Sequence, residues 1–324
     1  MKFEDIRRVS VLGAGIMGHG IAQSFLMGGY PVSLFDVDRS VLDRAAALIE
    51  QNLKLFAQFD LIDGAAVNAC LNRLTTTPDL KRCVAESRFI TEAAPEDLAL
   101  KRRLFSEVET YCPEDAILAS NTSSLTMADM GSAVRNRAGL VVTHWFNPPH
   151  IVPAVEVVRS KWTSEQTMDT TYRLLTKLGK LPVRVDRELP GFIVNRIQMA
   201  LIREVLSLYD QGVAGAEDID RAVKGSLGFR LASIGPLQTV DMGGVGLWLK
   251  VYEHLTPLIE SSTEPPAALL RLAGQGHQGI KTGKGFYDYT AENAHGSPND
   301  VVRRRDRELL NRLRNLYWKA ETEE

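Results

Sequence analysis

Two histidines and one glutamate in the segment THWFNPPHIVPAVEVV, residues 143–158, are of the types that transfer protons. A hydride can leave an alcohol carbon only if the hydroxyl proton also leaves, and a histidine that titrates near neutrality is suited to accept that proton. His144 lies at the end of an apolar run, and Glu156 follows 12 residues later among valines. A carboxylate on the far imidazole nitrogen would fix the tautomer and stabilise the imidazolium, so the segment predicts a His144–Glu156 pair for general-base catalysis.

The same residues also fit a purely structural role. His144 would then be a core histidine with satisfied hydrogen bonds, and Glu156 would face solvent on an edge strand. His150, after the double proline, either lines the mouth of a substrate site or caps a turn. The segment by itself leaves these alternatives open.

A glycine-rich loop, GAGIMG, lies between the apolar run VSVL and a helix-like segment. Gly13 would permit a tight turn, Gly15 would let the backbone approach a pyrophosphate, and Gly18 would let helix and strand pack closely. Asp36 ends the next apolar run, 18 residues after Gly18. A carboxylate there accepts hydrogen bonds from a ribose 2′-hydroxyl and repels a 2′-phosphate, so the pattern predicts NAD rather than NADP. The alternative is a glycine-rich turn without a ligand.

Strand-like and helix-like segments alternate along the first half of the chain, and they have to hold these groups in place. Short β-branched runs occur at residues 9–12, 32–35, 88–91, 116–120, 140–145 and 154–158. Their alternation with helix-like segments is typical of a mostly parallel α/β sheet. From Pro190 onward apolar residues recur at helical spacing, and strand-like runs largely disappear. We therefore predict a Rossmann NAD-binding domain over residues 1–187 and an all-α domain over residues 188–324, with a linker at 291–300 and a terminal amphipathic helix.

Composition excludes several kinds of partner. With 38 basic and 40 acidic residues the net charge is −2, so we expect neither nucleic acid nor an anionic membrane as a partner. Residues 9–35 contain no Asp, Glu, Lys or Arg, but six glycines and a proline argue against a membrane helix. Three cysteines without CxxC spacing argue against a disulfide framework or a metal site, and they fit a cytoplasmic protein.

Five sequence blocks together resemble the L-3-hydroxyacyl-CoA dehydrogenase family. They are GAGIMG, SNTSSL at 120–125, HWFNPP at 144–149, PGFIVNR at 190–196 and KTGKGFYDY at 281–289, in the family's order and over nearly the whole chain. The resemblance implies an NAD-dependent oxidation of a 3-hydroxyl group, a role in fatty acid metabolism, and a homodimer formed through the helical domain.

The resemblance also implies roles for individual residues. The catalytic pair falls on His144 and Glu156, and substrate-orienting groups fall on Ser123 and Asn195. The residues that help to hold the nicotinamide ribose are Glu96, Lys101 and Asn121. Ser123 follows a strand and Asn195 lies in the first turn of a helix, so both can offer short, well-fixed hydrogen-bond donors. As isolated residues they would be a turn serine and a helix-surface asparagine.

The substrate class stays open between a short 3-hydroxyacyl-CoA and a free 3-hydroxy acid. Between residues 40 and 80 the only basic residues are Arg44, Lys54 and Arg73, whereas a polyanionic CoA tail calls for several fixed positive charges. The stretch LGFRLASIGPLQTVDMGG, residues 227–244, resembles the branch with L-gulonate 3-dehydrogenase and carnitine dehydrogenase. That resemblance implies that Arg230 contacts a substrate carboxylate, for which a guanidinium is a bidentate match. The alternative for Arg230 is a salt bridge between domains or chains.

Two other classes of protein are less compatible with the sequence. A hydroxyisobutyrate-type dehydrogenase would use a lysine on the helix that follows Pro190, but PGFIVNRIQMALIREV contains arginines and no lysine. A crystallin-like, non-enzymatic protein would tolerate loss of the catalytic pair, yet both His144 and Glu156 are present.

Overall fold

The computed structural model describes residues 1–290 and 296–318, which contacts divide into two compact units. The first unit comprises Met1–Val194 together with the described residues from Arg305 onward, and the second comprises Asn195–Arg304. This grouping places residues 188–194 and the end of the chain with the first unit. The predicted boundary at residue 187 remains a prediction, and the predicted linker at 291–300 lies partly outside the described residues.

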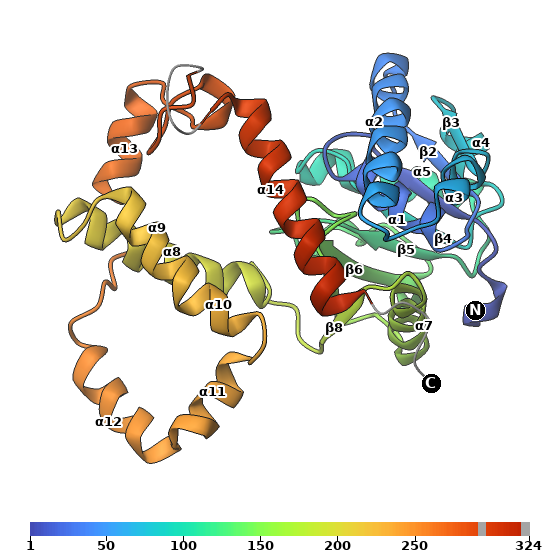
Figure 1. The fold of residues 1–324 in the computed structure, drawn as a ribbon. Coiled ribbons are helices and arrows are strands. Elements are labelled where there is room, and N and C mark those ends of the chain that lie inside the picture. The colour runs from blue at the N-terminus through green and yellow to red at the C-terminus, as the bar shows by residue number, and fades with distance from the viewer. Residues whose placement is uncertain (291–295, 319–324) are drawn as a thin grey trace. The chain divides into compact units, whose positions relative to one another are not determined.

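One eight-stranded sheet forms the centre of the first unit (Figure 1). Its order is β3-β2-β1-β4-β5-β6-β7-β8, and every neighbouring pair is parallel except β6 and β7. The strands are β1 (Val9–Leu12), β2 (Val32–Phe35), β3 (Leu74–Thr77), β4 (Phe89–Glu92), β5 (Ile117–Ser120), β6 (Leu140–Trp145), β7 (Ala154–Val158) and β8 (Leu181–Val185). This order confirms the predicted Rossmann fold with a mostly parallel sheet.

Helices cover both faces of that sheet, as parallel strands require. They are α1 (Gly18–Met27), α2 (Arg39–Gln58), α3 (Gly64–Leu71), α4 (Leu80–Val84), α5 (Leu98–Tyr111), α6 (Met127–Met130) and α7 (Glu165–Lys177), with the 3-10 helices η1 (Phe3–Asp5) and η2 (Arg137–Gly139). Alternate side chains of β1 enter two separate cores, because successive residues of a strand face opposite ways. Val9 and Val11 pack with α1, α2, α3 and α7, and Leu12 packs with α4, α5 and α6.

The second unit is helical, which confirms the predicted all-α character of this part of the chain. It contains α8 (Val194–Asp210) from its second residue, α9 (Ala216–Gly225), α10 (Leu227–Leu231), α11 (Pro236–Gly243), α12 (Val245–Leu255), α13 (Ala267–Gly274) and η3 (Ile280–Thr282). α14 (Pro298–Arg312) begins in this unit and ends in the first, where the π-helical turn η4 (Leu313–Tyr317) follows it. Among the described residues, no helix has the length and apolar character needed to cross a membrane.

Candidate active site

His144 and Glu156 face each other across the antiparallel pair β6–β7. They are direct partners in the strand register, and His144 Nδ1 lies 2.7 Å from Glu156 Oε2. Both side chains are buried. The single reversal of strand direction in the sheet therefore creates this pair, because directly opposed residues of antiparallel strands have neighbouring side chains.

The second carboxylate oxygen of Glu156 is held by the backbone that leads into α8. Oε1 accepts hydrogen bonds from the N–H groups of Ile193 and Val194, each at 2.9 Å. The chain presents these amides after Gly191 and Phe192, which have φ angles of +79° and +46°. Two free amides at a helix start stabilise an anion, so Glu156 has a complete set of partners without solvent. The sequence contained no signal for these backbone donors.

Two aromatic rings flank the imidazole of His144. The ring of Phe146 lies edge-on with its centroid 4.6 Å away, and the Phe192 centroid lies at 5.5 Å. Because the Glu156 carboxylate accepts from Nδ1, the neutral form of this imidazole carries its proton on Nδ1 and its lone pair on Nε2. Nε2 forms no hydrogen bond within the described part of the chain. The geometry suits Nε2 for accepting a proton from a ligand.

The glycine loop has the close backbone contacts that a nucleotide-binding turn needs. Gly13 has a φ of +97°, and a Cβ added there would lie 2.7 Å from the Ala93 carbonyl oxygen. A Cβ at Gly18 would lie 1.7 Å from the Gly13 carbonyl oxygen, whereas one at Gly15 meets no protein atom within 4 Å. Gly13 and Gly18 thus serve the packing of the loop, and Gly15 leaves open space before the start of α1 for an anionic ligand.

A cavity of about 640 Å³ lies beside this loop, at the carboxyl ends of β1, β2 and β4. Asp36 lines it and is oriented by the loop itself, because its Oδ2 accepts a hydrogen bond from the Ala14 N–H at 2.9 Å. Arg103 and Glu107 also line it, and the other lining residues are mostly apolar: Phe35, Val37, Pro78, Leu80, Ala94, Pro95, Leu100 and Leu104. An apolar slot with a carboxylate at its edge fits the adenine and ribose of a dinucleotide.

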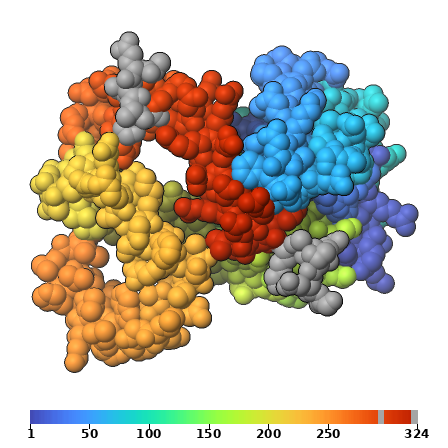
Figure 2. All heavy atoms as spheres, in the orientation of Figure 1, coloured from blue at the N-terminus to red at the C-terminus, as the bar shows by residue number. Residues whose placement is uncertain are grey.

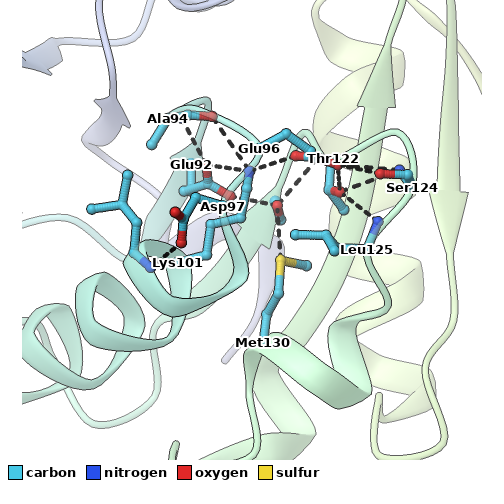
Figure 3. A network of polar contacts seen from close by, with 11 residues as sticks. Glu92, Ala94, Glu96, Asp97, Lys101, Thr122, Ser124, Leu125 and Met130 are labelled. Atoms are coloured by element: carbon cyan, nitrogen blue, oxygen red, sulfur yellow. Dashed lines mark hydrogen bonds and ion pairs between the residues drawn. The ribbon is translucent and has the colours of Figure 1, made fainter.

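A polar network lies at the carboxyl ends of β4 and β5, between β4, α5 and the loop after β5 (Figure 3). Lys101 Nζ lies 2.7 Å from Glu92 Oε1 and 3.1 Å from Glu96 Oε2. Glu96 also accepts hydrogen bonds from the Thr122 hydroxyl and from the Ser124 hydroxyl and N–H. Partial burial raises the pKa of Glu96, but the Thr122 bond, the Lys101 charge and Ser124 outweigh it and lower this pKa to about 2. Glu96 is therefore ionised, and Glu92 is a member of the network that the sequence analysis missed.

The remaining predicted site residues divide between the two units. Asn121 Oδ1 accepts a hydrogen bond from the Trp145 N–H at 2.9 Å, which ties the end of β5 to the residue after His144. Ser123 is exposed in the loop that follows β5. Asn195, partly exposed in the first turn of α8, and Arg230, exposed in α10, belong to the second unit. The structure thus groups His144, Glu156, Glu96, Lys101, Asn121 and Ser123 within one unit, and it places Asn195 and Arg230 in the other.

His150 is buried between the rings of His19 and Phe56. Its Nδ1 has no hydrogen-bond partner in the described structure. Burial, with smaller effects from the charges of His19, Lys180 and Arg305, lowers the pKa of His150 to about 3, so this ring is neutral at physiological pH. An imidazole with so low a pKa is too weak a base to take a proton from a substrate near neutral pH.

Comparison with known proteins supports this description of both units. The family model for the NAD binding domain of 3-hydroxyacyl-CoA dehydrogenase matches residues 8–189, and the model for its C-terminal domain matches residues 191–289. The chain is 35% identical to L-carnitine dehydrogenase of Streptomyces griseus, over 90% of this chain and 88% of that one. It is 34% identical to 3-hydroxybutyryl-CoA dehydrogenase of Clostridioides difficile, over 87% and 99%.

A solved structure with a similar fold is that of a 5-formyl-3-hydroxy-2-methylpyridine 4-carboxylic acid 5-dehydrogenase, described as an NAD⁺-dependent dismutase. It has a TM-score of 0.89 and 28% sequence identity, and the alignment covers 97% of this chain and all of that one.

Proposed function

This chain belongs to the 3-hydroxyacyl-CoA dehydrogenase family and is an NAD-dependent oxidoreductase, and from that premise we propose that His144 is the general base in oxidation of a 3-hydroxyl group to a ketone. One observation carries the proposal. Glu156 holds His144 through Nδ1 and is itself held by two backbone amides, so Nε2 of a buried imidazole is fixed as the proton acceptor.

In this mechanism each residue has a separate role. His144 Nε2 takes the hydroxyl proton, and Glu156 stabilises the imidazolium that results. When bound, NAD supplies the hydride acceptor. Ser123 and Asn195 orient the reacting oxygen. Glu96 and Asn121 hold the ribose on the nicotinamide side, and Lys101 contributes through its ion pair with Glu96. The rings of Phe146 and Phe192 keep water away from the imidazole.

His144→Gln tests the base assignment. Glutamine retains a polar group of similar reach but cannot take a proton, so kcat should fall by about three orders of magnitude or more. The dissociation constant for NADH, measured by fluorescence titration, should stay within about twofold of wild type because His144 does not belong to the nucleotide cavity. A variant that turns over at a near-normal rate would exclude His144 as the base.

For the substrate we favour a free 3-hydroxy acid over a short 3-hydroxyacyl-CoA. In the part of the chain that the structure describes, the Arg230 guanidinium donates to Ser226 Oγ at 3.3 Å and forms no ion pair. It is therefore available for a carboxylate, which pairs with arginine in a bidentate manner. Two of the similar proteins also carry names of dehydrogenases that act on free acids, carnitine and a pyridine carboxylic acid.

A substrate panel distinguishes the two classes. We expect kcat/KM for the best free 3-hydroxy acid to exceed that for 3-hydroxybutyryl-CoA, and Arg230→Met to raise KM for the acid by about tenfold or more with a smaller effect on the thioester. A strong preference for the thioester, unchanged in the variant, would remove Arg230 from the site. The general-base assignment would stand in either case.

We also propose that the protein is a homodimer formed through its second unit. The helices α10, α11 and α12 expose many large apolar side chains, among them Phe229, Leu237 and Met242 at 76%, 81% and 72%. The face shown in Figure 2 presents α11 and α12 as the orange lower lobe of this unit. Exposed apolar surface on this scale is typical of an interface. A cytoplasmic location and a role in fatty acid metabolism remain predictions.

A further inference from the structure

Glu92 is a buried carboxylate to which the proposed chemistry assigns no role. It is the last residue of β4, at the carboxyl edge of the sheet, and its side chain is 1% exposed. A buried charge is retained only where partners compensate for its lost hydration. The partners of Glu92 therefore indicate what this carboxylate does.

Three segments of the first unit meet at the Glu92 carboxylate (Figure 3). Oε1 accepts hydrogen bonds from the Ala94 N–H at 2.6 Å and from Lys101 Nζ at 2.7 Å. Oε2 accepts from the Ser120 hydroxyl at 2.5 Å. Glu92 thus joins the loop that carries Glu96, the helix α5 and the strand end that precedes Asn121 and Ser123.

Lys101 has no donor left for a ligand in this arrangement. Its Nζ contacts Glu92 Oε1, Glu96 Oε2 at 3.1 Å and the Ala94 carbonyl oxygen at 3.4 Å, which accounts for all three protons of the ammonium group. The side chain is also 1% exposed, whereas Glu96 is 38% exposed. Of these two residues, Glu96 is the one that can reach a ribose.

We propose that Glu92 is a positioning residue for the cofactor, and that it acts through Lys101 on Glu96. The negative charge of Glu92 keeps the Lys101 ammonium inside the protein and shares it between two carboxylates. Oε1 of Glu96 accepts from Thr122 and Ser124, whereas Oε2 then has Lys101 as its one contact and keeps a lone pair for a ribose hydroxyl group. This inference rests on the proposed role of Glu96 at the nicotinamide ribose.

The electrostatics of the Glu92–Lys101 ion pair support the same role for Glu92. If Glu92 lost its charge, Glu96 would be the sole carboxylate left to compensate a buried ammonium among the ion pairs of the described residues. Coulombic attraction in a buried site is strong, so Lys101 would draw Glu96 inward and occupy its lone pairs. The consequence for the enzyme is weaker cofactor binding, with the His144–Glu156 pair unchanged.

Glu92→Gln is a suitable probe because the amide has the same shape. Its oxygen can accept from Ala94 and Lys101. Its NH₂ group can donate to the Ser120 hydroxyl, which reverses that bond and leaves Met130 Sδ as the acceptor for the Ser120 proton, so the main change is the loss of charge. We expect the dissociation constant for NADH to rise by about tenfold, and kcat at saturating NAD to stay within about threefold of wild type. A change in NADH affinity of less than twofold would overturn the proposal.

A double-mutant cycle with Lys101→Met shows whether Glu92 acts through Lys101. Without the ammonium Glu92 has no means of acting on Glu96, so Glu92→Gln should change NADH affinity by less than about twofold in the Lys101→Met background. A further tenfold loss, as in the wild-type background, would mean that Glu92 acts by another route and would overturn the proposal. Should either single variant fail to fold, the double variant, which leaves no buried unpaired charge, is compared with wild type. Its NADH affinity should stay close to that of wild type because no ammonium draws Glu96 inward, and a tenfold loss would overturn the proposal.

Two controls separate this inference from the proposed function and from a purely structural effect. Glu109→Gln makes the same chemical change in a carboxylate of α5 that accepts from the N–H groups of Arg135 and Asn136. It should lower Tm and leave NADH affinity within twofold. Glu96→Gln should weaken NADH binding if the proposed ribose role is right. Loss of affinity in Glu96→Gln but not in Glu92→Gln would refute the present inference alone, and no loss in Glu96→Gln would refute the proposed role.

Discussion

At the residue scale, the proposed base depends on how completely its carboxylate partner is satisfied. Glu156 accepts from His144 through one oxygen and from two backbone amides through the other. An ionised carboxylate can accept at both oxygens, and no neutral side chain of the same shape can do so. The charge of Glu156 is therefore required by its surroundings whether or not a substrate is bound.

Glu156→Gln is expected to damage both catalysis and stability. Either the amide NH₂ group points at the Ile193 and Val194 N–H groups, or it points at His144 and forces the wrong tautomer. We expect kcat to fall by about two to four orders of magnitude and the free energy of unfolding to fall by about 1–3 kcal/mol. Steady-state kinetics and urea denaturation measure the two effects. Wild-type kcat in a folded variant would show that Glu156 has only a structural role.

Lys180 is a buried ionisable residue, and its burial should make the stability of the fold depend on pH. Its Nζ donates to the carbonyl oxygens of Pro149 and Val152 at 2.7 and 3.0 Å, within the loop between β6 and β7. Burial lowers the pKa of Lys180 to about 7 from its ordinary value of 10.5. Because the folded pKa lies below the unfolded one, the charged amine destabilises the fold at pH values below 7, and this cost is relieved as pH rises from 7 toward 10.5.

The free energy of unfolding of wild type should therefore rise with pH relative to that of Lys180→Met. Between pH 7 and pH 9 the difference should grow by up to about 1.4 kcal/mol per pH unit. Urea denaturation of both proteins at several pH values measures it, and other titrating groups cancel in the comparison. A difference that stays constant across this range would show that Lys180 keeps its ordinary pKa.

At the scale of elements, two glycines between β1 and the first turn of α1 have different functions. One allows close packing, and the other leaves room for a ligand. A Cβ at Gly18 would collide with the Gly13 carbonyl oxygen, and a Cβ at Gly15 would meet no protein atom. Gly15 lies in the loop and Gly18, three residues later, is the first residue of α1, so they form a matched pair of sites for the same substitution.

Gly15→Ala should bind NADH at least about tenfold more weakly, with Tm within a degree or two of wild type, because the added methyl group occupies the approach of the pyrophosphate. Gly18→Ala should lose cofactor affinity and also several degrees of Tm, because strand, loop and helix must move apart. NADH fluorescence titration and thermal unfolding provide the readouts. Full NADH affinity in Gly15→Ala would place the pyrophosphate elsewhere.

At the scale of the whole molecule, the exposed apolar side chains of α10–α12 are the basis of the proposed dimer. Leu237→Glu combined with Met242→Glu should convert the proposed dimer to a monomer, because two charges would be buried at the interface. Analytical ultracentrifugation at micromolar concentration measures the mass. Leu48→Glu, which changes an exposed leucine of α2 in the first unit, should leave the dimer intact. A monomeric wild type would refute the dimer.

Much of this protein was determined by local sequence patterns. The glycine loop, six of the eight strands, the helical second unit and the choice of NAD follow from runs and spacings within about 30 residues. The two strands that the sequence did not indicate are β3 and β8, which form the two edges of the sheet. Edge strands are partly exposed, and LTTT and LPVRV accordingly lack the continuous apolar run of a buried strand.

The tertiary structure decided how the chemical groups are held. The register of β6 and β7 places Glu156 opposite His144, and the amides of Ile193 and Val194 approach Glu156 from 37 and 38 residues away. Glu92 gained its role in the same way, because its partners come from α5 and from β5. A backbone amide is common to every residue except proline and carries no sequence signal, and burial of a charge depends on all the segments that surround it. Local patterns therefore specified the elements and the cofactor, and only folding specified which donors surround each carboxylate.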